Sequence, residues 1–179
     1  MKTLLTIFFL SITISISAQG EYTELEQEVD KKAKTLREVL EAQDYYSDFE
    51  KINTVSFKVD TFIVEEILSG KLDIDFTTIG MIEAMYDAEK KYDKLLNKYY
   101  KILMDMLEEE DKETLRTSQR NWITFRDSEK NVAAMLTQEH YTGGGTMHNI
   151  TLAYENMMIT KRRVIELYNH ICRFYEYGY

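Results

Sequence analysis

The fold of this chain is best predicted from residues 92–100, which read YDKLLNKYY. Within them Tyr92, Leu96 and Tyr99 are spaced by four and then three residues, like side chains on one face of an α-helix. The same spacing continues in both directions over residues 82–106. An apolar face of this length has to be buried against other elements. The stretch therefore predicts a long helix that packs against partners.

Three further segments carry apolar residues at helical spacing. Proline is absent and glycine is scarce, which favours long uninterrupted helices. Four apolar faces predict an all-α fold, an antiparallel bundle of four long helices. The further faces are Tyr22, Leu25, Val29, Leu36, Val39 and Tyr46; then Leu115, Trp122, Phe125, Val132 and Leu136; then Met147, Ile150, Tyr154, Met157, Val164, Tyr168 and Ile171.

Residues 54–76 have two interpretations. Val55, Phe57 and Val59 alternate as in a short strand, whereas the segment Asp60–Gly70 resembles a short capped helix that ends at a glycine. We favour the helix, which makes the predicted fold four long helices plus a short extra one.

The breaks between the long helices fit this picture. Thr77 or Thr78 is suited to cap the second helix, and Thr146 the fourth. The acidic run Glu108–Asp111 separates the second and third helices. The glycines at 143–145 require a flexible connection between the third and fourth.

The first residues have the features of an export signal. Lys2 is followed by an apolar run at 4–16 and by the small residue Ala18. This run is shorter than the about 20 residues of a membrane span, so we expect no retained transmembrane anchor. An anchored chain is the alternative. We expect cleavage near Ala18 and a periplasmic or secreted mature protein.

The chain is acidic, with 31 acidic against 22 basic residues and a net charge of −9. Loss of residues 1–18 removes Lys2, which leaves 21 basic residues and a net charge of −10. This balance argues against nucleic acid or an anionic membrane surface as a partner, because both require a basic surface. It favours a cationic partner, although acidity also serves solubility alone.

Three polar motifs lie on the predicted helices. They are D-x-x-L-N-x-x-Y at 93–100, Q-R-x-W-x-x-F-R-D at 119–127 and T-x-x-R-x-x-E-L at 160–167, with the glycine break between the last two. In this order, over roughly Thr77 to Tyr168, they resemble the LprI-like lysozyme-inhibitor family. The resemblance implies a small exported helical domain and a role in inhibiting lysozyme or in tolerating attack on the cell wall. Lysozymes are commonly cationic, which agrees with the charge.

The polar residues of these motifs are either a binding site or a network that fixes the register of the helices. We favour the network, because Glu89 and Glu129 have core spacing, where a carboxylate is costly unless it is paired. Arg126 and Arg163 are the expected partners. The predicted network comprises Glu89, Asp93, Asn97, Gln119, Arg126, Asp127, Glu129, Thr160 and Arg163.

Two further features are candidates for contact with a partner. Trp122 lies midway along an apolar face, so we predict a core anchor, with partner contact as the alternative. The loop after the third helix is the best candidate for recognition, because glycine allows close backbone approach. A simple turn between helices is the other explanation. The candidate loop residues are Tyr141, Gly143, Gly144, Gly145 and Thr146.

The sequence carries no pattern typical of catalysis. His140, His148 and His170 lack the spacing of a metal site, and the acids lie on solvated helix faces. Cys172 is the sole cysteine, so no internal disulfide can form, unlike in many relatives of the resembled family. We expect no catalytic residue, no metal and no cofactor.

The leading hypothesis is an exported, non-catalytic binding protein, a lysozyme inhibitor or an envelope protective factor. The alternative is a structural or oligomerising module of the cell envelope, which predicts an exposed apolar face on the first helix at Leu25, Val29, Leu36 and Val39. A carrier would instead need a cavity among methionines, whose other explanation is core filling. Those methionines are Met81, Met85, Met104, Met106, Met157 and Met158.

These interpretations divide the chain into four parts. Residues 1–18 are the signal peptide, 19–75 an N-terminal helical extension, 76–172 the LprI-like domain and 173–179 a frayed tail. The sequence leaves the oligomeric state open.

Overall fold

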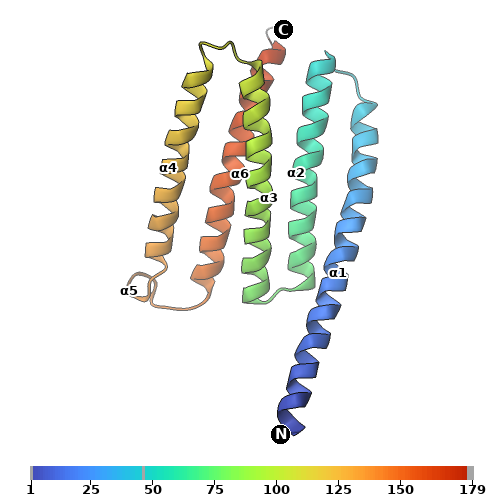
Figure 1. Cartoon of the computed structure of the whole chain (residues 1–179), viewed down its shortest axis with the longest axis vertical. Helices are drawn as coiled ribbons and strands as arrows, with labels where there is room; N and C mark the ends of the chain where they lie inside the picture. Colours follow the sequence, from blue (N-terminus) through green and yellow to red (C-terminus); the bar gives the residue numbers. More distant parts are fainter. Residues whose placement is uncertain (1, 46, 177–179) are drawn as a thin grey trace.

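The computed structural model describes residues 2–45 and 47–176, and within these ranges the chain is all-α, as predicted. Five long helices lie side by side in the order α4, α6, α3, α2 and α1 (Figure 1). The short α5 joins α4 to α6. The elements are α1 (Lys2–Glu41), α2 (Asp48–Ile74), α3 (Thr78–Met106), α4 (Lys112–Leu136), α5 (Glu139–Thr142) and α6 (Met147–Glu176).

The helices α3 and α6 form the centre of the molecule and share its most extensive interface. Figure 1 shows that they run in the same direction. Helix α4, which separates them in the sequence, runs in the opposite direction. Helices adjacent in sequence run antiparallel. Helix α2 packs against α3 and α6, α1 packs against α2, and α4 contacts mainly α6 at the opposite edge.

The core confirms the helical stripe of residues 92–100. Tyr92 and Tyr99 are fully buried and Leu96 is nearly so, and they pack with Leu167 and Ile171 of α6. A second, smaller cluster joins α1 to α2 through Ala33, Leu40, Val55 and Val59.

The buried tyrosines each bring a polar group into the core and satisfy it with an acid from α2. The hydroxyl of Tyr92 donates to Glu65, and that of Tyr99 donates to Asp60 at 2.7 Å. Lys161 of α6 also pairs with Glu65 at 2.7 Å. Burial, and then the Glu65 carboxylate, raises the pKa of Tyr92, so this hydroxyl stays protonated and acts as a donor.

The prediction of a short helix in residues 54–76 is wrong, because α2 runs unbroken from Asp48 to Ile74. Gly70 does not end it. A Cβ at Gly70 would come within 2.3 Å of Leu25 Cδ1, so this glycine allows α1 and α2 to approach closely. Val55 packs against α1, while Phe57, on the opposite face, stacks on Tyr168 of α6. Burial of both faces produced the strand-like alternation.

The buried faces of the outer helices also differ from the apolar faces predicted for them. On α1, Val29 is buried and Leu25 and Leu36 are half-buried, so the exposed face predicted there is absent apart from Val39. The largest group of exposed apolar residues on one helix lies on α4: Ile123, Phe125, Val132, Met135 and Leu136. On α6, Met147 and Tyr154 are exposed as well.

Helix α4 departs from the prediction because a different face points inward. Leu115, Gln119, Trp122 and Arg126 follow one another by four, three and four residues, and Leu115 and Gln119 are its buried residues. Phe125 is one residue from Arg126, so it lies about 100° around the helix. The inner face of α4 is therefore largely polar.

Two of the predicted helix boundaries are confirmed. Thr77 caps α3 by accepting a hydrogen bond from the Gly80 N–H at 3.0 Å, and the acidic run Glu108–Asp111 separates α3 from α4. Helix α6 continues through residues 173–176 of the predicted tail, while Met1, Tyr46 and residues 177–179 lie outside the described part. Among the described helices none has an apolar stretch long enough to cross a membrane.

Two glycines provide a matched test of this packing. We expect Gly80→Ala to lower the free energy of unfolding by about 1–3 kcal/mol, because its Cβ would lie 2.5 Å from the backbone oxygen of Asp75. In Gly70→Ala the obstacle is the mobile end of Leu25, and alanine gains about 1 kcal/mol in helix propensity, so little net change is expected. Urea unfolding of both variants measures the difference. Equal losses would contradict this account.

Candidate functional site

The motifs of α3 and α4 face one another across a groove of about 360 Å³. The structure thus brings together eight motif residues that lie on two separate predicted helices. Neighbouring side chains that the motif analysis did not single out as site residues complete the walls. The groove is lined by Asp93, Leu96, Asn97 and Tyr100 from α3 and by Arg116, Gln119, Arg120, Trp122, Ile123 and Arg126 from α4.

Arg126 lines this groove, and its guanidinium has several partners. Its Nε donates to Asp127 Oδ1 at 2.9 Å, and its Nη1 lies 3.7 Å from Asp93 Oδ1. The guanidinium carbon is 5.3 Å from the centre of the Trp122 ring. Asn97 in turn donates to the backbone oxygen of Asp93 at 2.9 Å. Arg126 therefore links α4 to α3 by charge.

Arg163 is buried and links α6 to α4. Its Nε donates to Gln119 Oε1 at 3.1 Å and its Nη2 to Ser118 Oγ at 3.3 Å. Its Nη1 donates to Glu166 at 3.1 Å on the same helix. The guanidinium also lies 5.8 Å from the Trp122 ring. The side chain thus satisfies each nitrogen while it holds two helices together.

The predicted partners of the glutamates are wrong. Glu89 is partly buried, but it pairs with Lys130 of α4 and not with an arginine. Glu129 is exposed, so it needs no buried partner. Thr160 is buried in α6, and its hydroxyl has no hydrogen-bond partner in the described part of the chain. Trp122 is half-buried and packs against the main core from α4.

The prediction missed three residues of this network, and the sequence held a signal for two of them. Lys130 follows Arg126 by four residues, so it shares the inner face of α4. Glu166 follows Arg163 by three, which is the spacing of a helical ion pair. Ser118 is adjacent to Gln119, but its contact with Arg163 depends on tertiary structure and has no local signal.

The predicted contact loop lies at the opposite end of the bundle from the end of α6 (Figure 1). Gly143, Gly144 and Gly145 all have positive φ, of 75°, 87° and 108°, which explains the need for glycine at these positions. The Gly144 N–H donates to the Thr142 hydroxyl at 3.1 Å, and the Gly143 N–H donates to Glu139 O at 2.7 Å. The loop therefore has a defined shape.

Side chains around this loop point outward. Tyr141 is 56% exposed, and its ring lies 3.9 Å from that of His140. Thr146 is exposed too. Within the described residues, no group of three His, Cys, Asp or Glu side chains is placed to hold a metal ion. The loop offers an aromatic side chain and exposed backbone, which suits binding.

Arg163 offers a test of how far α4 depends on one side chain. We expect Arg163→Ala to lower the free energy of unfolding by roughly 2–4 kcal/mol, because it leaves Gln119 unpaired in a buried place and removes a cation from Trp122. Arg162→Ala is the control, since Arg162 is exposed and a surface change costs within about 0.5 kcal/mol. Thermal unfolding of both variants measures the effect, and two similar melting temperatures would refute the assignment.

No curated protein and no solved structure matches this chain. A family model does match: the one described as lysozyme inhibitor LprI aligns with residues 73–167. This range is more than half of the chain, and it contains all three motifs, the α3–α4 groove and the glycine loop. The chain therefore belongs to the LprI lysozyme-inhibitor family.

Proposed function

We propose that this protein is exported and acts without catalysis, by binding a lysozyme and inhibiting it. The family match over residues 73–167 is the observation that carries this proposal. The net charge of −9 supports it, because an acidic surface speeds encounter with a cationic enzyme. The features of an export signal in residues 1–18 also support it, because lysozymes act in the periplasm or outside the cell.

The glycine loop is the proposed contact. A lysozyme cleaves its glycan between two carboxyl groups that lie across a cleft, so an inhibitor has to enter that cleft or cover it. The loop protrudes at one end of the bundle and presents Tyr141 to solvent. Its internal hydrogen bonds reduce the ordering cost of binding. Aromatic anchors of this kind often dominate binding energy.

The motif network then has an architectural role in this proposal. The loop connects the end of α4 to the start of α6. Arg163 fixes α4 against α6, and Arg126 and Lys130 fix α4 against α3. These contacts set the position of both loop ends, so the motifs matter for inhibition without touching the lysozyme. On this view residues 76–172 form the inhibitory domain and 19–75 extend its core.

Inhibition should be measurable with purified protein. We expect micromolar protein to reduce the rate at which a cationic lysozyme lyses bacterial cell walls, and moderate salt to weaken the effect, because the Debye length is only about 10 Å at 0.1 M ionic strength. Tyr141→Ala should raise the half-inhibitory concentration by about tenfold or more. Tyr154→Ala is the matched control, since Tyr154 is similarly exposed but lies on α6.

Two results would argue against the proposal. Full lysozyme activity at micromolar protein in low salt would remove the inhibitor hypothesis. Equal effects of Tyr141→Ala and Tyr154→Ala would keep inhibition but remove the loop as its contact.

A second candidate function is an oligomerising module of the cell envelope. It is favoured by the apolar side chains exposed on α4, of which Phe125 is 54% and Leu136 48% exposed. Exposed apolar residues that cluster on one helix are typical of interaction surfaces.

Sedimentation of the free protein tests this second candidate. It predicts a dimer or larger species at tens of micromolar that Phe125→Ser combined with Val132→Ser converts to monomer. Val39→Ser is the control, because Val39 is an isolated exposed side chain on α1. A parent protein that sediments as a monomer would exclude the oligomerising module.

A further inference from the structure

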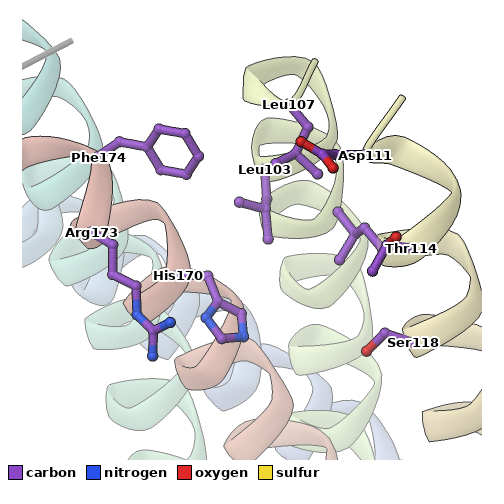
Figure 2. Close-up of a pocket in the computed structure, with 9 residues that line it drawn as sticks. Leu103, Leu107, Asp111, Thr114, Ser118, His170, Arg173 and Phe174 are labelled. Carbon is purple, nitrogen blue, oxygen red and sulfur yellow. The ribbon is translucent and has the colours of Figure 1, made fainter. Parts of the chain in front are cut away.

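An open apolar groove of about 710 Å³ lies at the end of the bundle where α6 ends, opposite the glycine loop. Figure 2 shows its arrangement: α6 forms one wall, α4 the other, and α3 lies between them. Small-molecule sites in proteins usually measure about 300–1,000 Å³, so the groove has a suitable size.

The surfaces of this groove that face its centre are mainly apolar. Leu103 of α3 and Leu107, just after its end, point into it, Leu115 contributes from α4, and the ring of Phe174 closes it from α6 (Figure 2). Leu103 and Leu115 are buried parts of the main core. The groove is therefore an open extension of the core, and an apolar ligand there would gain by leaving water.

The α6 wall carries two nitrogen-bearing side chains at one edge. Arg173 and His170 lie next to each other there (Figure 2). Within the described part of the chain, neither side chain forms an ion pair or a hydrogen bond, whereas Arg163 on the same helix is paired. Burial, and then the charges of Arg173 and Arg163, lowers the pKa of His170. The edge thus presents one fixed positive charge beside a neutral imidazole that can donate a hydrogen bond.

A second cavity, of about 430 Å³, adjoins the groove and leads toward α2. It shares Leu107, Asp111 and Phe174 with the first and extends to Phe49 of α2 and Met106. Its rim is acidic, because Glu108 and Asp111 line it. The combined groove therefore has an apolar length with a cationic edge in the first cavity, Asp111 in the part that the cavities share, and Glu108 in the second.

We propose that this groove binds a single acyl chain with an acidic head group. The head group pairs with Arg173 and His170, and the chain lies over Leu103, Leu107 and Phe174 toward Phe49. Asp111, in the part that the two cavities share, and Glu108, in the second cavity, repel an anion from that side, so charge directs the head group to the Arg173 edge. A second copy of this protein is a poor occupant, because each copy carries a net charge of −9.

Calorimetric titration of the full chain with three probes tests the ligand class. The probes are dodecanoate, the lysophosphatidic acid with the same chain, and dodecyltrimethylammonium as the cationic control. We expect the two acids to bind at least tenfold more tightly than the ammonium compound. Tighter binding of dodecanoate points to free fatty acids as the source, and tighter binding of the lysophosphatidic acid points to lipids. Equal affinity for all three probes would overturn the proposal.

Two variants locate the site. Arg173→Glu should weaken dodecanoate binding at least tenfold, whereas Arg162→Glu makes the same charge change on an exposed position of α6 outside the groove and should leave binding unchanged. Thr114→Trp should block all binding, because Thr114 is exposed on the α4 wall and a large ring there fills the groove. Thermal unfolding verifies that each variant folds. Unchanged binding in Arg173→Glu would refute the site.

This inference does not depend on the proposed function. Arg173 lies at the end of the molecule opposite the glycine loop, so Arg173→Glu should inhibit lysozyme as the parent does. Loss of lipid binding with inhibition intact, and the reverse, are therefore separate outcomes.

Discussion

One buried cation, the guanidinium of Arg163, joins α4 to α6. Helix α4 offers few apolar side chains to the core, since Leu115 and Gln119 are its buried residues. The arginine reaches from α6 and gives each of its nitrogens a partner, two of them on α4. A buried charge without such partners would cost several kcal/mol. Helix α4 forms a wall of the α3–α4 groove and of the apolar groove, and the glycine loop begins after it. The contact of Arg163 with α4 therefore affects the geometry of all three.

Polar side chains also join α3 to α2, at two places in the core. Tyr92 and Tyr99 are separated by seven residues on α3, and each donates its hydroxyl to an acid of α2 that also meets a lysine. Each aromatic ring fills the core while its polar end reaches the boundary between helices. Because hydrogen bonds are directional, these pairs specify the register of α2 on α3 more strictly than apolar packing does.

Much of this fold could be predicted from periodicity alone. The face of α3 through Tyr92, Leu96 and Tyr99, the cap at Thr77 and the acidic break before α4 are local features, and each appears where the sequence places it. Gly70 was misinterpreted because a helix terminator and a close helix crossing use the same residue. The inner face of α4 was misassigned because an apolar stripe was assumed where polar residues face inward. The groove beside Phe174 lies between the ends of three helices. A local sequence pattern cannot predict such a tertiary arrangement.

The parallel pair of α3 and α6 has a consequence for how the chain folds. The largest interface joins two helices that are separated in sequence by all of α4 and the glycine loop. Bringing α3 and α6 together orders this long segment, so chain entropy is lost before the contacts of the core can compensate for it. The hairpin of α1 and α2 is local and needs no such closure. A chain synthesised from its N-terminus can therefore form this hairpin early, but it completes its core only after α6 has emerged from the ribosome.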